Sequence, residues 1–251
     1  MAEALLEVRN LSRRFAAVDA LIAVNFCVVA GEVHALIGPN GAGKTTFIHH
    51  VSGALQPDSG SVHFAGREVT KLSMHQRVAA GMARSYQITN LFPGFSLLDN
   101  VALAVQGRRD AGSSFRFWKP VRGEQGLFDE ALGFLEQVGL EKKSGNLAGN
   151  LAHGEQRALE VAMALATKPK MLLLDEPMAG AGPEESARMV ELIEHLARHV
   201  TILLVEHDMA AVFRLADRVS VLVNGRLICT GAPDEVRADP EVRRAYLGDS
   251  A

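Results

Sequence analysis

Short apolar runs bounded by turn residues divide the chain into predicted strands. Residues 33–37, 171–174 and 201–205 are almost entirely apolar, which is typical of strands buried on both faces of a parallel sheet. Residues 184–199 lie between the last two runs and predict a helix. The order strand, helix, strand indicates a β–α–β unit, in which the helix connects two parallel strands.

Further strands are predicted near both ends of the chain, where apolar residues alternate or run together between turns. These segments are residues 5–8, 21–29, 61–64, 67–69, 219–223 and 226–230. Ala65-Gly66 and Asn224-Gly225 each separate two of them, and such pairs favour tight hairpin turns. We therefore expect antiparallel strands in addition to the parallel sheet.

The middle of the chain predicts helices. Helical texture extends over residues 74–138 with one interruption at 107–126, and another helix runs from residue 154 to residue 168. Two short helices near the end each have a proline near their start, Pro233 and Pro240. The combination predicts an α/β fold.

Composition narrows the class of protein. The chain has 251 residues, a net charge of −3 and 48% hydrophobic residues, so it can bury a core and has no overall basic charge to attract nucleic acid. No run approaches the ~18 apolar residues that span a bilayer, and the first residues do not resemble a signal peptide. Cys27 and Cys229 lie in apolar runs, which predicts buried, reduced thiols and a cytosolic protein.

One stretch matches G-x-x-x-x-G-K-[ST], a loop that cradles phosphates. It consists of Gly38, Pro39, Asn40, Gly41, Ala42, Gly43, Lys44 and Thr45. It follows a predicted strand and precedes a helix that includes Thr46 and stops near Gly53. Backbone N–H groups and the helix end attract a triphosphate, Lys44 binds its β- and γ-phosphates, and the Thr45 hydroxyl ligates Mg²⁺. The alternative is a glycine-rich turn that binds nothing.

Two carboxylates follow the apolar strand at residues 171–174. Asp175, at the end of that strand, can reach the Mg²⁺ held by Thr45. Glu176 projects toward the γ-phosphate and can accept a proton from the attacking water. Acidic pairs also occur as ordinary turn residues, so this interpretation depends on the phosphate loop upstream.

Two further polar residues are candidate site residues only because the phosphate loop and the acidic pair are present. Gln87 follows residues 82–86 and can contact Mg²⁺ or its water. His207 ends the strand at 201–205 and can contact the γ-phosphate while holding the water and Glu176 in place. In isolation, each would be an ordinary surface residue.

Residues 151–156 read Leu-Ala-His-Gly-Glu-Gln and resemble the L-S-G-G-Q signature of ABC ATPases. The phosphate loop, the glutamine, the signature, the acidic pair and the histidine follow the family order over essentially the whole chain. The resemblance implies that Ala152, His153, Gly154 and Gln156 bind ATP and that Phe15 stacks on adenine. Taken alone, Phe15 would be a core phenylalanine.

Details of the sequence resemble the branched-chain amino acid importers within this family. These carry L-A-Y-G-Q-Q at the signature, Glu-His-Asp-Met around the histidine, as in residues 206–209, and Ala-Tyr-Leu-Gly near the end, as in residues 245–248. Lipopolysaccharide-export ATPases share the Tyr-Leu-Gly ending but usually keep serine in the signature. They are the second candidate.

The resemblance implies the architecture of a P-loop NTPase, an ABC nucleotide-binding domain over residues 1–251. Residues 1–86 and 155–251 would form a RecA-like core with an antiparallel β subdomain, and residues 87–154 a helical subdomain with the insert 107–126. Two such chains, identical or paralogous, would bind ATP and Mg²⁺ head to tail. They would drive two transmembrane permeases at the cytoplasmic face of the inner membrane, served indirectly by a substrate-binding protein.

Other interpretations remain open at this stage. The cargo can differ, for instance urea, amides or aromatic compounds, and a non-transport ABC ATPase acting on nucleic acid is a rival. That rival usually has paired cassettes or basic extensions, which this sequence lacks. A binding module without turnover is supported only by Ala152, in place of the signature serine, and Gly182, where many relatives have aspartate. A small-molecule kinase is disfavoured by the signature.

The insert 107–126 mixes basic and aromatic side chains. The basic residues are Arg108, Arg109, Arg116, Lys119 and Arg122, and the aromatic residues are Phe115, Phe117 and Trp118. This mixture suits a surface that docks on the permease or on anionic lipid headgroups. A loop whose aromatics pack locally is the alternative.

Overall fold

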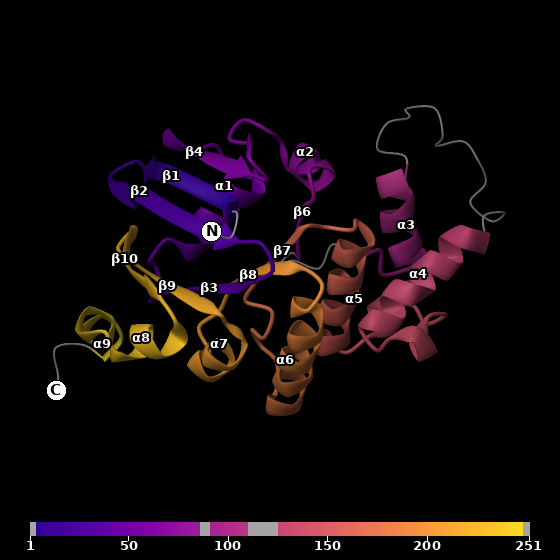
Figure 1. Ribbon diagram of the computed structural model, residues 1–251. Helices are drawn as coiled ribbons and strands as arrows, with labels where there is room; N and C mark the ends of the chain where they lie inside the picture. Colours follow the sequence, from indigo (N-terminus) through magenta and orange to yellow (C-terminus); the bar gives the residue numbers. More distant parts are fainter. Residues whose placement is uncertain (1–3, 86–90, 110–124, 248–251) are drawn as a thin grey trace.

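Two sheets form the framework of the protein (Figure 1). The computed structural model describes residues 4–85, 91–109 and 125–247. A four-stranded sheet has the order β2-β1-β4-β5, and a six-stranded sheet has the order β10-β9-β3-β8-β7-β6. The strands are β1 Ala4–Phe15, β2 Val18–Val29, β3 Val33–Ile37, β4 Ser59–Phe64, β5 Arg67–Glu68, β6 Met82–Arg84, β7 Met171–Asp175, β8 Thr201–Val205, β9 Arg218–Val223 and β10 Arg226–Gly231.

The strand pairing confirms both sheet types expected from the sequence. In the six-stranded sheet, β3, β6, β7, β8 and β9 run parallel, and β10 returns antiparallel along β9. The turn between β9 and β10 is Asn224-Gly225, where both residues have positive φ. The smaller sheet is antiparallel throughout. Because parallel strands share one carboxyl edge, the loops after β3, β7 and β8 meet there.

The sequence pattern did not predict strand β6, and it predicted β1 and β2 to be shorter than they are. Helical texture was expected over residues 74–106, but residues 82–84 form β6, which pairs with Met171, Leu172 and Leu173 of β7. Three residues carry no usable periodicity, and β6 is defined by a partner distant in the sequence. Strand β1 extends to Phe15 rather than residue 8, and β2 begins at Val18 rather than residue 21, because the two form one long hairpin with several register shifts.

Helices lie on both faces of the parallel sheet, and α3 and α4 pack beside it against α5 (Figure 1). The described helices have the following bounds. They are α1 Lys44–Ser52, α2 Met74–Ala79, α3 Leu97–Arg109, α4 Gln125–Gln137, α5 His153–Ala166, α6 Pro183–Ala197, α7 Met209–Leu215, α8 Pro233–Ala238 and α9 Pro240–Leu247, with short 3-10 turns at Glu141–Lys143 and Ala148–Asn150. Helix α1 lies between the two sheets, where Phe47, Ile48 and Val51 pack in one cluster with side chains of both.

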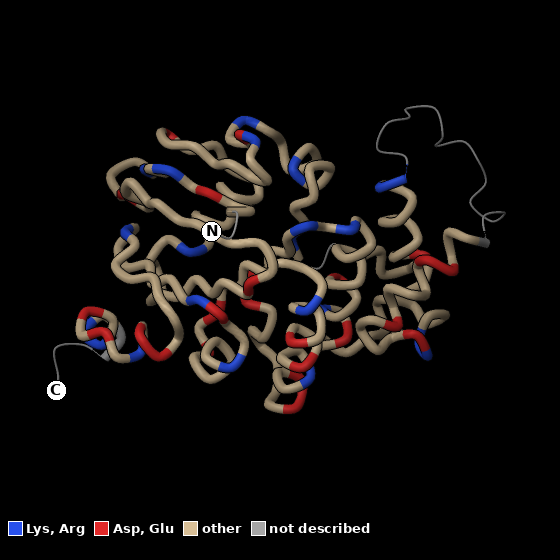
Figure 2. The backbone as a smooth tube through the Cα atoms, viewed as in Figure 1, with Lys and Arg blue, Asp and Glu red and all other residues tan. Residues whose placement is uncertain are grey.

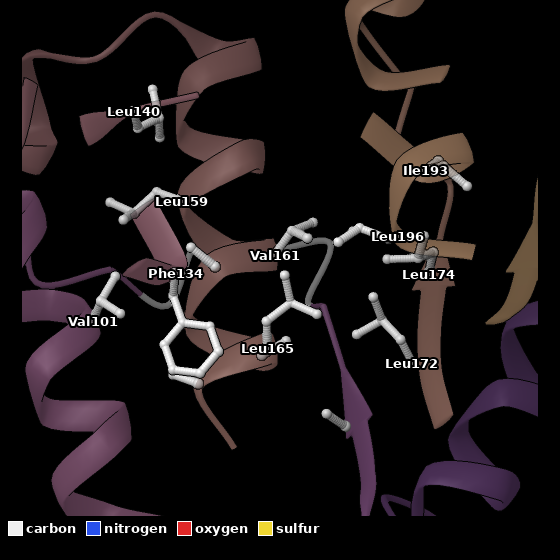
Figure 3. Packing of buried hydrophobic residues seen from close by; sticks show 14 of the residues in the cluster. Val101, Phe134, Leu140, Leu159, Val161, Leu165, Leu172, Leu174, Ile193 and Leu196 are labelled. Carbon is white, nitrogen blue, oxygen red and sulfur yellow. The ribbon is translucent and has the colours of Figure 1, made fainter. Parts of the chain in front are cut away.

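Alternate side chains of β7 enter different cores. Leu173 joins the cluster around α1, whereas Leu172 and Leu174 join a second cluster with α5 and α6 (Figure 3). This alternation follows from the two-residue period of a strand. The second cluster continues through Leu159 of α5 to Phe134 of α4, so that the helical part and the sheet share one continuous core.

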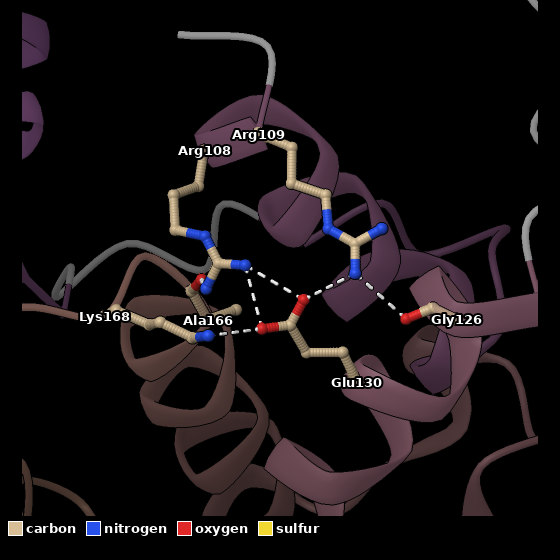
Figure 4. Close-up of polar contacts among 6 residues, drawn as sticks. All are labelled: Arg108, Arg109, Gly126, Glu130, Ala166 and Lys168. Atoms are coloured by element: carbon tan, nitrogen blue, oxygen red, sulfur yellow. Dashed lines mark hydrogen bonds and ion pairs between the residues drawn. The ribbon is translucent and has the colours of Figure 1, made fainter.

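A carboxylate in the middle of α4 joins the C-terminal ends of α3 and α5. Glu130 of α4 accepts hydrogen bonds from Arg108 and Arg109 at the end of α3, and it forms an ion pair with Lys168 just after α5 (Figure 4). Hydrogen bonds from Lys168, Arg108 and Arg109 lower the pKa of Glu130 to about 2. Arg108 and Arg109 belong to the insert for which the sequence predicts a docking surface, and they also hold α3 against α4. The docking surface itself stays a prediction. The aromatic residues of the insert lie outside the described residues.

The cysteines and the charged residues are the features that composition addressed. Cys27 and Cys229 are free thiols, but both are half-buried rather than buried. Burial still raises the pKa of each thiol. Acidic and basic residues are interspersed along α6 to α9 (Figure 2).

Candidate ATP site

The loop between β3 and α1 has a shape that only glycine permits at two positions. A Cβ on Gly38 would lie 2.1 Å from the carbonyl oxygen of Leu222, and one on Gly43 would lie 2.4 Å from that of Ala20. Gly43 also has φ of 105°, a conformation that other residues rarely adopt. Neighbouring strands thus hold the loop closely against the start of α1.

Lys44 lies inside this loop. Its Nζ donates hydrogen bonds to the carbonyl oxygens of Gly38 at 2.6 Å and Pro39 at 3.1 Å. Burial lowers the pKa of Lys44, while the negative charges of Glu176 and Asp175 oppose that effect. The ammonium group is therefore largely buried and has carboxylates as electrostatic neighbours.

A cavity of about 360 Å³ opens over the loop. The motif residues that line it are Asn40, Gly41, Ala42, Gly43, Lys44, Thr45 and Thr46. Glu176 lines the same cavity from the turn after β7, although it is far from the loop in sequence. The cavity therefore brings a phosphate-binding loop and an acidic side chain together, which is the arrangement that phosphoryl transfer to water requires.

Asp175 ends β7 and is buried. Its Oδ2 accepts a hydrogen bond of 2.8 Å from Nη2 of Arg84, which comes from β6 and also donates to Oγ of Ser52. The sequence interpretation missed Arg84, because its role depends on the unexpected pairing of β6 with β7. A hydroxyl at Thr45 and a carboxylate at Asp175 are hard oxygen donors, so these residues fit Mg²⁺.

Glu176 has an unusual backbone conformation. Its φ is 48°, in the left-handed region that non-glycine residues seldom occupy. The Glu176 N–H donates to the carbonyl oxygen of Val205 at 2.8 Å, which fixes the turn to the end of β8. Strain of this kind tends to persist where function requires a particular side-chain direction.

His207 follows β8 and has a side chain that is 60% exposed, with Nδ1 3.6 Å from Oε2 of Glu206. Glu206, in contrast, is completely buried. It accepts hydrogen bonds from the backbone N–H groups of Met178 at 3.0 Å and His207 at 2.9 Å. The sequence interpretation gave Glu206 no role, and a charged residue after an apolar strand was the only available signal.

The signature residues lie at the start of α5. Ala152 is the N-cap, followed by His153 and Gly154 in the first turn, and the side chain of Gln156 donates to the carbonyl oxygen of Leu151 at 3.2 Å. Ala152 and His153 are exposed. Among the described residues that line the cavity over the loop, none belongs to this segment. Within one chain, the signature and the phosphate loop are therefore separate.

Of the two remaining predicted site residues, Phe15 lies within the described part of the chain and Gln87 does not. Phe15 ends β1, is 42% exposed and has the Arg13 guanidinium 4.8 Å from its ring centroid, so it is not a core residue. It pairs with Val18, which lines the cavity. Gln87 lies outside the described residues.

Comparisons with known proteins agree with this geometry. A family model described as "ABC transporter" matches residues 21–179, and one described as "Branched-chain amino acid ATP-binding cassette transporter" matches residues 226–251. The chain is 36% identical to the high-affinity branched-chain amino acid transport ATP-binding protein LivG of Escherichia coli, over all of both chains. It is 37% identical to the corresponding protein BraF of Pseudomonas aeruginosa, again over all of both chains.

Solved structures show the same fold. The crystal structure of the ADP conformation of MJ1267, an ATP-binding cassette of an ABC transporter, superposes with a TM-score of 0.85 at 29% identity. The match covers 98% of this chain and 100% of that one. In residues 4–85, 91–109 and 125–247, no helix has the length and apolar character needed to cross a membrane. The chain belongs to the ABC transporter ATP-binding proteins of the branched-chain amino acid type, and it is an ATP-hydrolysing subunit.

Proposed function

We propose that this subunit hydrolyses ATP at the cavity over the P-loop to power uptake of branched-chain amino acids through two separate permease subunits. The observation that carries the proposal is the convergence of Lys44, Thr45 and Glu176 on one cavity. The cargo is supported by the relatives and by the family match at residues 226–251. A substrate-binding protein would deliver the amino acid to the permeases from outside.

Each residue of the site has a different role in ATP hydrolysis. Backbone N–H groups of the loop and Lys44 bind the phosphates, and Thr45 and Asp175 would hold Mg²⁺, which would offset charge on the phosphates when bound. Glu176 takes the proton of the attacking water, and His207 orients that water against the γ-phosphate. Gln87 would contact Mg²⁺ or its water. Phe15 supports adenine at the end of the β1–β2 hairpin.

A second cassette completes each site. ABC cassettes dimerise and form complexes with permease subunits. Because the signature of one chain lies apart from its own cavity, we place Ala152, His153, Gly154 and Gln156 against the ATP of the other chain, either a copy or a paralogue. The first-turn N–H groups of α5 bind the γ-phosphate there even without the signature serine. Gly182 has ordinary φ of −73°, so its backbone does not require glycine.

We place the permease contact at a second cavity of about 200 Å³ between the core and the helical part. It is lined by α2, β6, α3 and α5, and it includes Arg84 and Ser85, close in sequence to Gln87. Arg84 connects the cavity directly to Asp175. Such a contact fixes the cassette peripherally on the cytoplasmic face of the inner membrane.

Transport in cells tests the cargo. A strain lacking the gene should lose uptake of radiolabelled leucine, isoleucine and valine, and the wild-type gene should restore it. A Glu176→Gln gene should not restore uptake, although its product should reach the membrane in equal amount. Normal uptake of these amino acids in the deletion strain, with loss of urea or aromatic amino acid uptake instead, would overturn the assigned cargo.

A further inference from the structure

The turns after β7 and β8 carry the acid and the histidine of the site, and one buried side chain joins them. Glu206 has no exposed surface. Its Oε1 accepts the N–H of Met178, 28 residues away, while its Oε2 accepts the N–H of His207 at 2.9 Å and that of Asp208 at 3.5 Å. Each carboxylate oxygen thus serves a different turn.

The bond to Met178 fixes the backbone around Glu176. The Glu176 N–H is held by the carbonyl oxygen of Val205, and Pro177 has no N–H. The next available donor is therefore Met178, and Glu206 binds it. Glu176 itself has left-handed φ of 48°, a conformation that persists only where the surroundings hold it. The backbone is therefore held both at Glu176 and two residues beyond it.

A charged carboxylate suits this position better than a neutral amide. Both turns present N–H donors to Glu206, and an ionised carboxylate accepts at both of its oxygens. Glutamine has nearly the same shape, but one of its two ends carries donors. Its amide oxygen can therefore accept a hydrogen bond from the N–H of either Met178 or His207. The N–H of the other residue then faces the NH₂ group of the glutamine and has no acceptor.

We propose that Glu206 is a positioning residue that sets the direction of Glu176 relative to His207 and so determines the rate of the hydrolytic step. Glu206 lies behind the cavity and is not among its described lining residues, so it acts through the two turns rather than on ATP. The turn beyond Met178 leads to Gly182 and α6. Glu206 therefore also joins the histidine to the segment that precedes α6. The inference rests on the proposed role of Glu176 as the base.

Single-turnover hydrolysis of prebound ATP, normalised to the ATP bound per chain, tests this role. Glu206→Gln should bind ATP with an affinity within about twofold of wild type, because Lys44 and the P-loop are untouched. Its single-turnover rate should fall about 10- to 100-fold, as expected when a reacting group is displaced by about 1 Å. Glu32→Gln, which changes a largely buried glutamate that accepts the N–H of Val29 outside the site, is the matched control and should leave the rate unchanged.

A second variant keeps the test decisive if Glu206→Gln does not fold. Glu206→Asp keeps the charge and the local bonds to His207 and Asp208, but it is too short to reach Met178, so its rate should also fall. A folded variant of either kind with the wild-type single-turnover rate would overturn the inference. Glu176→Gln separates the role of Glu176 as the base from the role of Glu206 as the positioning residue. Wild-type turnover of Glu176→Gln would refute the base assignment. If Glu176→Gln is inactive and Glu206→Gln is fully active, only the role of Glu206 is refuted.

Discussion

Glu160 of α5 is a buried carboxylate that should destabilise the protein near neutral pH. It is 7% exposed, its Oε2 lies 3.3 Å from Nη1 of Arg157, and its Oε1 has no hydrogen-bond partner among the described residues. Burial raises the pKa of Glu160 to about 7, and the charge of Arg157 only partly offsets this. Folding therefore favours the protonated acid.

The direction of the pH effect follows from this raised pKa. Below the ordinary value of 4.5, the acid is protonated in both the folded and the unfolded chain and contributes no penalty. As pH rises toward 7, only the unfolded chain ionises freely, so the folded state loses stability. At ~1.4 kcal/mol for each pKa unit, the full penalty above pH 7 is about 3 kcal/mol.

Glu160→Gln removes this penalty while keeping the shape of the side chain. Because Arg157 loses its ionic partner, we expect a gain in unfolding free energy of about 1–3 kcal/mol at pH 8. For a chain of this size, that gain corresponds to a rise in Tm of roughly 2–10 °C. At pH 4.5 most of the gain should disappear, because half of the unfolded chains are then protonated at this position.

Thermal and urea unfolding at pH 4.5 and pH 8 measure the effect. Glu136→Gln, at an exposed glutamate of α4, controls for replacing a glutamate by its amide. The same gain at both pH values, or a loss of stability at pH 8, would refute the reasoning from burial.

Three other substitutions test separate features. Glu176→Gln should bind ATP but lose nearly all turnover, because the amide cannot take the proton, and ATP should then trap dimers that sedimentation detects. Near-wild-type turnover would rule out the base. In that background, Ala152→Ser should strengthen ATP-dependent dimers by about 1–3 kcal/mol through a hydroxyl bond to the charged γ-phosphate; unchanged sedimentation would mean that the position is misassigned. Glu130→Gln should lower unfolding free energy by about 1 kcal/mol at pH 7, since it loses three cationic partners at a partly exposed site. The loss should fade as pH falls from 4.5 toward 2, where the lowered pKa of Glu130 lies, and acid titration of unfolding checks it.

The sequence by itself determined the parts of the site that are contiguous in the chain. The loop around Lys44 is specified locally, because its glycines, the preceding apolar strand and the following helix lie within a few residues of one another. The same holds for the acidic pair at the end of β7 and for the hairpin at Asn224-Gly225. Periodicity and turn chemistry act over such short distances, so these elements could be predicted without coordinates.

Only the tertiary structure decided which distant residues meet. Strand β6 exists because β7 pairs with it, and that pairing brings Arg84 to Asp175. Glu206 follows an apolar strand in the sequence, but its role depends on Met178, which only the parallel order of β7 and β8 brings within hydrogen-bond distance. Hydrogen bonds and ion pairs form over about 3 Å in space and carry no period along the chain. For this reason, the motifs identified the chemistry, whereas the fold determined what holds each reacting group in place.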